Sequence, residues 1–251
     1  MWQEVIIFVA VGFAAQLVDG AIGMAYKIIA LSLLTTSGMC PLVASAGIHV
    51  AATFTTAASG LAHWRLGNLD PILVRRLILP GMIGGILGAL ALTIISGAAI
   101  RPLVGLYLAA LGVFILRKTF NGLKLTRKAL RSVEPIGFAG GLFDSFGGGW
   151  GAIVTPTLIG AGVPSRTAIG SVNGAEFFVT ATIAATLVPA IEVTMMPAVI
   201  GLLAGGLVAA PLAALATRYI PGRALTTAVG CVVIVLGVYN LFQPLLERLG
   251  L

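Results

Sequence analysis

One motif occurs twice in this chain, each time inside an apolar run. The first copy begins with Gly12-Phe-Ala and the second with Gly137-Phe-Ala, and each has an aspartate seven residues after that glycine, Asp19 and Asp144. Further glycines follow both aspartates before the next apolar run begins. Glycine tolerates backbone conformations that other residues resist. We therefore predict an interrupted helix in both copies, broken near Asp19 and Gly20 in the first and at residues 147–151 in the second. Paired interruptions in corresponding halves of a membrane protein are typical of a transport site.

The composition places these interruptions in a membrane. Hydrophobic residues make up 59% of the 251 residues and charged residues only 9%, whereas soluble domains have about 25% charged residues. The fold class expected is an all-α polytopic membrane protein of the cell (inner) membrane, in contact with the lipid bilayer. The net charge of +7 does not indicate a nucleic-acid partner, because the basic residues lie in short loops between apolar runs, as cytoplasmic loops of membrane proteins do.

The apolar runs form two matched sets of four. The first set covers about residues 5–34, 41–61, 77–95 and 102–116, and the second covers about residues 136–158, 164–187, 197–216 and 224–242. In both sets the second run begins at a proline, and the third contains Gly-x-x-x-Gly, which lets helix backbones approach closely. We therefore predict two homologous four-segment repeats, residues 1–116 and 136–251. Residues 117–135 form the basic cytoplasmic connecting loop between them.

The relative orientation of the two repeats depends on how each Gly-rich segment crosses the membrane. If each broken segment crosses once, the repeats are parallel. If each folds back as a re-entrant pair of half-helices, the repeats are inverted, and Arg65, Arg166 and Arg223 lie on the same side as the basic connecting loop. Basic residues concentrate on the cytoplasmic side, so the charge distribution favours the inverted arrangement.

The two aspartates are the first candidates for function, together with the glycines beside them: Gly20 and Gly23 in the first copy, and Gly147, Gly148 and Gly149 in the second. A carboxylate in the hydrocarbon core is costly and usually marks a pathway, so Asp19 and Asp144 are candidate proton acceptors. Alternatively, each aspartate accepts backbone N–H bonds from the following half-helix. The two roles are compatible, and a capped half-helix still presents its positive end to an anion.

Four further polar residues lie in the apolar segments. In the aligned repeats, His49 corresponds to Asn173 and Ala52 to Glu176. His49 is either a satisfied core residue or a proton-linked group. Glu176 is expected to serve in coupling or binding, because a buried carboxylate must be neutralised or paired. Lys27 is an ion-pair partner, an anion contact, or a side chain that extends to the membrane surface.

Several classes of site are not expected. The glycines at 147–151 lack the Gly-Lys-Ser/Thr of a phosphate loop, and no Gly-x-Ser-x-Gly or His-Glu-x-x-His motif occurs. Cys40 and Cys231 have no second ligand at metal-binding spacing. We therefore expect no enzymatic activity, no metal and no cofactor.

The chain resembles the TauE/SafE family, the sulfite exporter group of bacterial membrane transporters, over nearly its whole length. In the first half the resemblance rests on Gln16-Leu-Val-Asp19-Gly20, Gly23-Met-Ala-Tyr26, His49 and His63-Trp-Arg-Leu-Gly-Asn-Leu-Asp70. In the second half it rests on Gly140-Gly-Leu-Phe-Asp144, Gly147-Gly-Gly-Trp-Gly151, Thr155-Pro156 and Ser171-Val-Asn-Gly-Ala-Glu176. The family usually has Gly at the position of Lys27 and Glu at that of Ala52.

The resemblance implies transport of small sulfur-containing or organic anions such as sulfite or sulfonates. From the residues alone we predict a secondary transporter of a small anionic substrate, with proton coupling through a buried carboxylate. Two other interpretations stay open, a membrane-embedded subunit of a larger complex and an anion channel, and so does a homodimer.

Overall fold

The computed structural model describes residues 2–24, 26–94, 97–121, 133–191 and 195–216, together with isolated positions and short runs between 223 and 242. These residues form helices and turns, with no strand among them. The helices are α1 (Trp2–Ile22), α2 (Tyr26–Thr36), α3 (Pro41–Arg65), α4 (Pro71–Ile94), α5 (Gly97–Asn121), α6 (Val133–Asp144), α7 (Trp150–Gly160), α8 (Ser165–Leu187) with the short 3-10 turn η2 (Val188–Ala190), and α9 (Met196–Ala216).

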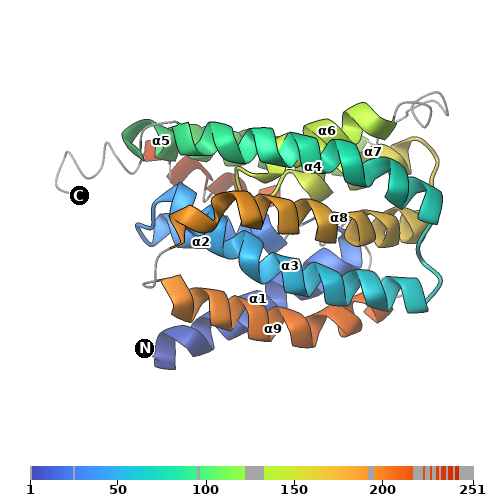
Figure 1. Cartoon of the computed structure of the whole chain (residues 1–251), viewed down its shortest axis with the longest axis horizontal. Coiled ribbons are helices and arrows are strands. Elements are labelled where there is room, and N and C mark those ends of the chain that lie inside the picture. The colour runs from blue at the N-terminus through green and yellow to red at the C-terminus, as the bar shows by residue number, and fades with distance from the viewer. Residues whose placement is uncertain are drawn as a thin grey trace.

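Four of these helices, α3, α4, α8 and α9, are long and apolar enough to cross a membrane. They lie along the long axis of the molecule in Figure 1. Their outer faces carry exposed leucine, isoleucine, valine and phenylalanine side chains, as lipid-facing helices do. The chain is therefore a multi-pass all-α membrane protein, which confirms the fold class predicted from composition.

Two of the apolar segments are broken into short helices. The first break separates α1 from α2 and contains Gly23, whose φ is 73°. The second separates α6 from α7 and contains Gly147 and Gly148, with φ of 104° and 121°. Residues with a side chain rarely adopt these values, so glycine is required at the breaks. With 11 residues each, α2 and α7 are only about 17 Å long, too short for a hydrocarbon core of about 30 Å.

The first break lies later in the chain than predicted. We expected it near Asp19 and Gly20, but α1 continues to Ile22. Gly20 lies inside this helix, where an added Cβ would overlap the side chain of Ala213 on α9. Its role is therefore close helix packing, and the backbone first leaves the helical region at Gly23.

Two other predicted boundaries were wrong by several residues. The helix α3 continues through Arg65, where a turn was expected, because His63 is buried and packs back against the carbonyl of Gly20. The helix α4 begins at Pro71, because Asp70 accepts hydrogen bonds from the first backbone N–H groups of that helix.

The connecting loop is also shorter than residues 117–135. The helix α5 extends to Asn121, since Arg and Lys have good helix propensity. The helix α6 begins at Val133, with Glu134 and Pro135 in its first turn, where both residue types are favourable. The predicted run 224–242 is described only in part, and its described residues, 227, 230–231, 233–235, 237–239 and 241–242, are helical.

Glycines bring two pairs of helices into close contact. On α4, a Cβ at Gly84 or Gly88 would overlap backbone atoms of α6. On α9, a Cβ at Gly201 or Gly205 would overlap backbone atoms of α1. The helices α1 and α9 pack together, as do α4 and α6, so each broken segment rests on the glycine-bearing helix of the other half. This is the close approach predicted from the Gly-x-x-x-Gly spacing.

Gly205→Leu should therefore destabilise the protein strongly. The new side chain would overlap the carbonyl oxygen of Val9 on α1, and overpacking of this kind costs about 1–3 kcal/mol or more. We expect a lower thermal midpoint in detergent and a low yield. Ala204→Leu is the matched control, because Ala204 is exposed on the same helix. Equal midpoints for the two variants would show that the contact between α1 and α9 is not tight.

The helices α3 and α8 lie side by side at the centre of the molecule (Figure 1). Gly60 and Gly174 approach closely where they cross, since a Cβ on Gly60 would lie 3.2 Å from the Cα of Gly174. Beside this crossing the Ser59 hydroxyl donates a hydrogen bond of 2.8 Å to Asn173 Oδ1. This central pair carries two of the ionisable residues singled out in the sequence, one on each helix.

Candidate functional site

The two breaks meet inside the protein. The Thr155 hydroxyl of α7 donates a hydrogen bond of 2.9 Å to the carbonyl oxygen of Gly23 in the first break. In the second break, a Cβ on Gly148 would lie 2.8 Å from the backbone nitrogen of Ile28 on α2. The N-terminal ends of α2 and α7 therefore lie next to each other, and the glycines are what permit this approach.

Each half-helix is capped by the aspartate that precedes its break. The backbone N–H of Tyr26 donates to Asp19 Oδ1 at 3.2 Å, and that of Trp150 donates to Asp144 Oδ1 at 3.1 Å. Tyr26 and Trp150 are the first residues of α2 and α7. The capping role predicted for both aspartates is confirmed, and the two breaks use the same device.

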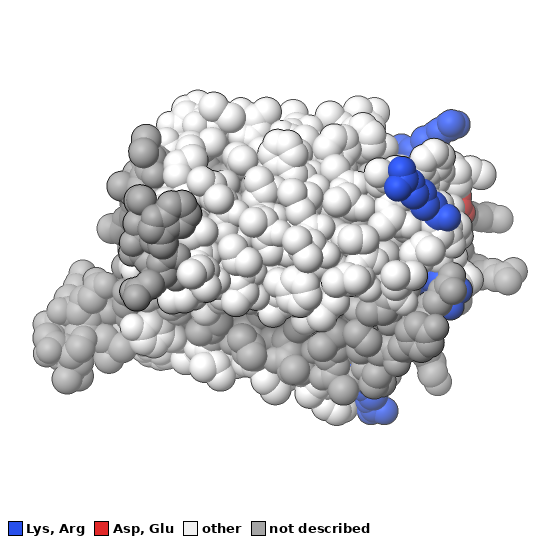
Figure 2. All heavy atoms as spheres, turned by 90° about the horizontal axis from the view of Figure 1, so that it is seen from below, with Lys and Arg blue, Asp and Glu red and all other residues white. Residues whose placement is uncertain are grey.

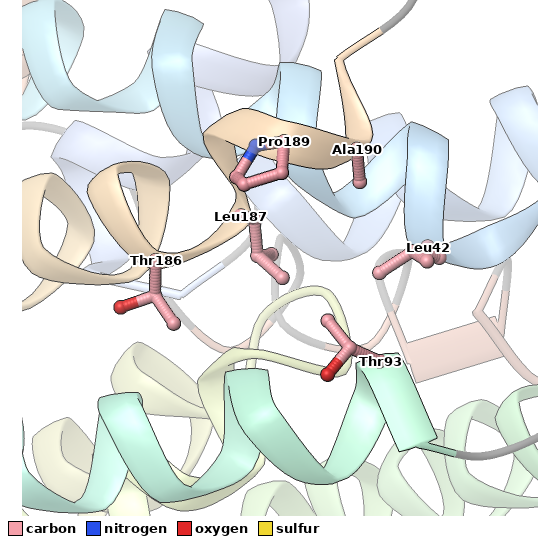
Figure 3. Close-up of a pocket in the computed structure, with 6 residues that line it drawn as sticks. All are labelled: Leu42, Thr93, Thr186, Leu187, Pro189 and Ala190. Carbon is pink, nitrogen blue, oxygen red and sulfur yellow. The ribbon is translucent and has the colours of Figure 1, made fainter.

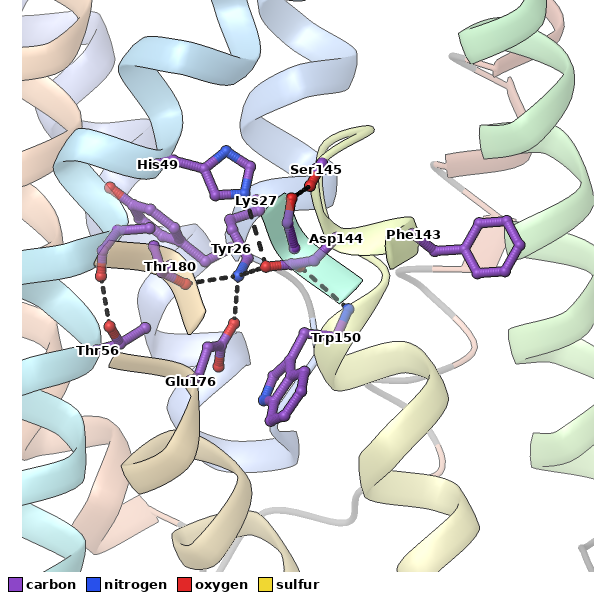
Figure 4. A network of polar contacts seen from close by, with 12 residues as sticks. Tyr26, Lys27, His49, Thr56, Phe143, Asp144, Ser145, Trp150, Glu176 and Thr180 are labelled. Carbon is purple, nitrogen blue, oxygen red and sulfur yellow. Dashed lines mark hydrogen bonds and ion pairs between the residues drawn. The ribbon is translucent and has the colours of Figure 1, made fainter. Parts of the chain in front are cut away.

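Lys27 lies at the centre of the site. Its ammonium Nζ is 2.5 Å from Asp144 Oδ2, 2.7 Å from Glu176 Oε1 and 3.1 Å from the Thr180 hydroxyl oxygen. Figure 4 shows these three contacts converging on the nitrogen. The Lys27 side chain is only 4% exposed, so the interpretation that it extends to the membrane surface was wrong. Its three N–H donors match three acceptors from α6 and α8.

His49 approaches the same carboxylate from α3. Its Nε2 lies 3.6 Å from Asp144 Oδ2, and its Nδ1 lies 2.7 Å from the carbonyl oxygen of Ser45, one turn earlier. The Ser45 hydroxyl donates to the carbonyl oxygen of Ser145, directly after Asp144, at 2.7 Å. The helix α3 thus holds the loop of the second break in place while it presents the imidazole to Asp144.

The structure therefore brings together four of the predicted residues, Lys27, His49, Asp144 and Glu176, from four different helices. All four are buried. Asn173 is placed differently: it binds Ser59 and, through its amide nitrogen, the carbonyl oxygen of its own helix at Ile169. Its observed contacts join α3 to α8.

The five predicted glycines also have different roles, because some form the breaks and others allow close packing. Gly23, Gly147 and Gly148 form the breaks, with positive φ. Gly149 has φ of −88° and precedes α7, where a Cβ would overlap Phe143. Gly20 belongs to the contact between α1 and α9 described above. These positions shape the backbone of the site, and the polar contacts come from the side chains around Lys27.

Two residues of the site were missed in the sequence. Thr180 follows Glu176 by one helical turn and supplies the third acceptor for Lys27, a spacing that could have identified it. Ser145 follows Asp144 directly, and its hydroxyl donates to the carbonyl oxygen of Gly85 on α4 at 2.8 Å. Neither residue stood out, because Ser and Thr are common in membrane helices.

Two recesses on the surface lie apart from this cluster. One, of about 280 Å³, is lined by Leu42, Thr93, Thr186, Leu187, Pro189 and Ala190 (Figure 3). The other, of about 430 Å³, is lined mainly by apolar residues of α3 and α8. Neither lining contains a charged side chain. The buried cluster around Lys27 is therefore the better candidate for a site that handles charge.

Comparison with known proteins agrees with this organisation. The family model described as sulfite exporter TauE/SafE matches residues 8–240. The probable membrane transporter protein YtnM of Bacillus subtilis (strain 168) is 37% identical over 222 residues, which cover 84% of this chain and 74% of that protein. No solved structure matches the chain. The chain belongs to the sulfite exporter TauE/SafE family.

Proposed function

We propose that this protein is a secondary transporter of small anions, with its substrate site where α2 and α7 meet. The family and the similarity to a probable membrane transporter support transport across a membrane. The observation that carries the proposal is the buried ammonium of Lys27, on the second residue of a half-helix inside a membrane protein. Intramembrane ionisable residues of this kind usually mark a substrate or ion pathway.

The charge arrangement favours an anion as substrate. The N-terminal ends of α2 and α7 direct the positive ends of two helix dipoles towards the same region. Lys27 adds a full positive charge, and Asp19 and Asp144 occupy the two helix ends. A small oxyanion has the same chemistry as these carboxylates, because it too presents several oxygen acceptors on one negatively charged group. Sulfite and sulfonates fit this description, and the family description points to sulfur-containing anions.

Proton coupling is part of the proposal. One ammonium, that of Lys27, faces the two carboxylates of Asp144 and Glu176. Glu176 Oε2 is buried and has no hydrogen-bond partner among the described groups. Buried polar groups normally have partners, and a buried charge without one is costly. One ammonium between two carboxylates leaves a negative charge in excess, and a proton bound within the cluster would balance it, so the site is suited to take up protons with its substrate.

We also propose that the two halves are inverted repeats. The pairing of α1 with α9 is matched by that of α6 with α4, and both aspartates cap in the same way. In Figure 1, α6 begins and α7 ends at the same end of the molecule, as a re-entrant pair does. The Lys and Arg side chains coloured in Figure 2 gather at that end. By the charge rule this end is cytoplasmic.

The orientation can be tested with single cysteines, after Cys40 and Cys231 are replaced by serine. Inverted repeats place Ser165, at the start of α8, on the same side as Asn121, at the end of α5. We expect a membrane-impermeant maleimide to label Ser165→Cys and Asn121→Cys from the cytoplasmic side only. Both residues are exposed. If the two variants are labelled from opposite sides, the repeats are parallel.

The transport function is tested with purified protein in proteoliposomes. We expect saturable uptake of labelled sulfite, thiosulfate or a sulfonate, stimulated by an inward proton gradient. Flux that does not saturate would favour an anion channel. Absence of flux for every anion, with and without the gradient, would reject the proposal and favour a subunit of a larger complex. The mass of the detergent-solubilised particle, measured on the same sample, tells a monomer from a homodimer.

A further inference from the structure

One carboxylate oxygen of the site faces two basic groups. Asp144 Oδ2 lies 2.5 Å from Lys27 Nζ and 3.6 Å from His49 Nε2, and both contacts are drawn in Figure 4. The other oxygen, Oδ1, accepts the backbone N–H of Trp150 and is held by the start of α7. The single oxygen Oδ2 is therefore shared between the ammonium of Lys27 and an imidazole that is charged only after it binds a proton.

The hydrogen bonds of His49 fix where that proton would bind. Its Nδ1 lies 2.7 Å from the carbonyl oxygen of Ser45, which can only accept, so Nδ1 carries the proton of the neutral ring. The lone pair of the neutral ring is then on Nε2, which is buried without a hydrogen-bond partner among the described groups. Two acceptors, Nε2 and Asp144 Oδ2, thus face each other. A proton on Nε2 would change this contact into a charge-assisted hydrogen bond.

We propose that one proton enters on His49 together with a singly charged anion, which binds Lys27. This inference rests on the transport function proposed above. A proton from the aqueous phase binds Nε2, and the imidazolium takes over Asp144 Oδ2. Lys27 loses this partner but keeps Glu176 and Thr180, and its freed N–H binds the substrate anion. No covalent bond to substrate forms or breaks.

The charge balance gives the stoichiometry. The titratable side chains that face Asp144 are Lys27 from α2 and His49 from α3, and Glu176 from α8 faces the same ammonium. Two further groups lie within electrostatic range: Asp19 on α1 of Glu176, and Tyr107 on α5 of Asp144. Adding an anion alone would leave one more negative charge buried among carboxylates, which is strongly unfavourable. One proton on His49 offsets the charge of a singly charged anion, so the net charge of the site does not change. Transport of such an anion is then electroneutral symport.

The test measures the protonation of His49 directly. The chain has only two histidines, so magnetic resonance of isotope-labelled imidazole in lipid nanodiscs gives two signals, and His63→Gln assigns them. We compare Glu176→Gln with Lys27→Met/Glu176→Gln. Both variants keep Asp144 as the carboxylate beside His49, and they differ only in the presence of Lys27. Removing Lys27 frees Asp144 Oδ2, so we expect His49 to bind protons about tenfold more tightly in the double variant. Equal proton binding in the two variants overturns the shared-oxygen mechanism.

A second arm of the test uses sulfite, thiosulfate and methanesulfonate. Binding is reciprocal, so any of these that the wild-type protein transports should raise the protonated fraction of His49 at a fixed, mildly acidic pH, and should have no such effect in the double variant. Methanesulfonate keeps a single charge, and its uptake should not respond to membrane voltage. A transported anion that leaves His49 unchanged overturns the proposal. If none is transported, the anion function fails, while the variant comparison still decides the competition for Asp144.

Discussion

Lys27→Met is expected to abolish anion uptake and to destabilise the protein. The variant leaves Asp144 and Glu176 buried without the ammonium that lies 2.5 Å and 2.7 Å from them. Breaking a buried ion pair by removing one partner costs about 3–5 kcal/mol. The proposed contact with the anion is lost at the same time. If that contact contributes about 3 kcal/mol to binding, its loss lowers the affinity for the anion about a hundredfold. The measurements are initial uptake rates in proteoliposomes and the thermal midpoint in detergent.

A charge-balanced variant separates the two effects. Lys27→Met/Glu176→Gln removes one positive and one negative charge, so the net charge of the cluster does not change. We expect this variant to recover most of the lost stability, because Asp144 still caps α7 and faces His49. It should remain inactive in uptake. Recovery of uptake together with stability would show that Lys27 serves only to hold the fold and does not bind the substrate.

The second large effect is expected for Gly148→Ala. The backbone at Gly148 has φ of 121°, and holding a residue with a side chain in such a region costs about 1–3 kcal/mol. The added Cβ would also lie 2.6 Å from Ile28 Cγ1 and 2.8 Å from the Ile28 backbone nitrogen. The two breaks would have to move apart, which would carry Asp144 away from Lys27. We therefore expect a large drop in both the thermal midpoint and the uptake rate.

Gly162→Ala is the control for backbone strain. Gly162 has φ of 94°, and nothing lies within 4 Å of a Cβ added there. This variant has the strain but not the overlap, so we expect a small decrease in stability and near-normal uptake. The difference between the two variants measures how closely the breaks must approach. Equal losses in Gly148→Ala and Gly162→Ala would mean that strain alone accounts for the effect.

Features set by short stretches of the chain could be predicted from the sequence. The apolar runs predicted membrane helices, because a segment in lipid must satisfy its backbone hydrogen bonds internally, as a helix does. The glycines predicted the two breaks, and each aspartate caps a half-helix six or seven residues later in the same segment. Helix ends were less accurate. Arg65 lies in a helix because the neighbouring His63 is buried, and the burial of one histidine cannot be predicted from a polar stretch. Val133 lies in a helix because Glu134 and Pro135 are favourable in a first turn.

The partners of the charged residues were decided only by the tertiary structure. Lys27 lies eight residues after Asp19 in sequence, yet its ammonium binds Asp144, 117 residues away. That pairing depends on α2 passing directly over the second break, which requires glycine at 148 and a hydrogen bond from Thr155 to Gly23. His49 reaches the same carboxylate oxygen from a third helix, α3. Residue spacing along one helix carries no information on such contacts, because they depend on how separate helices pack.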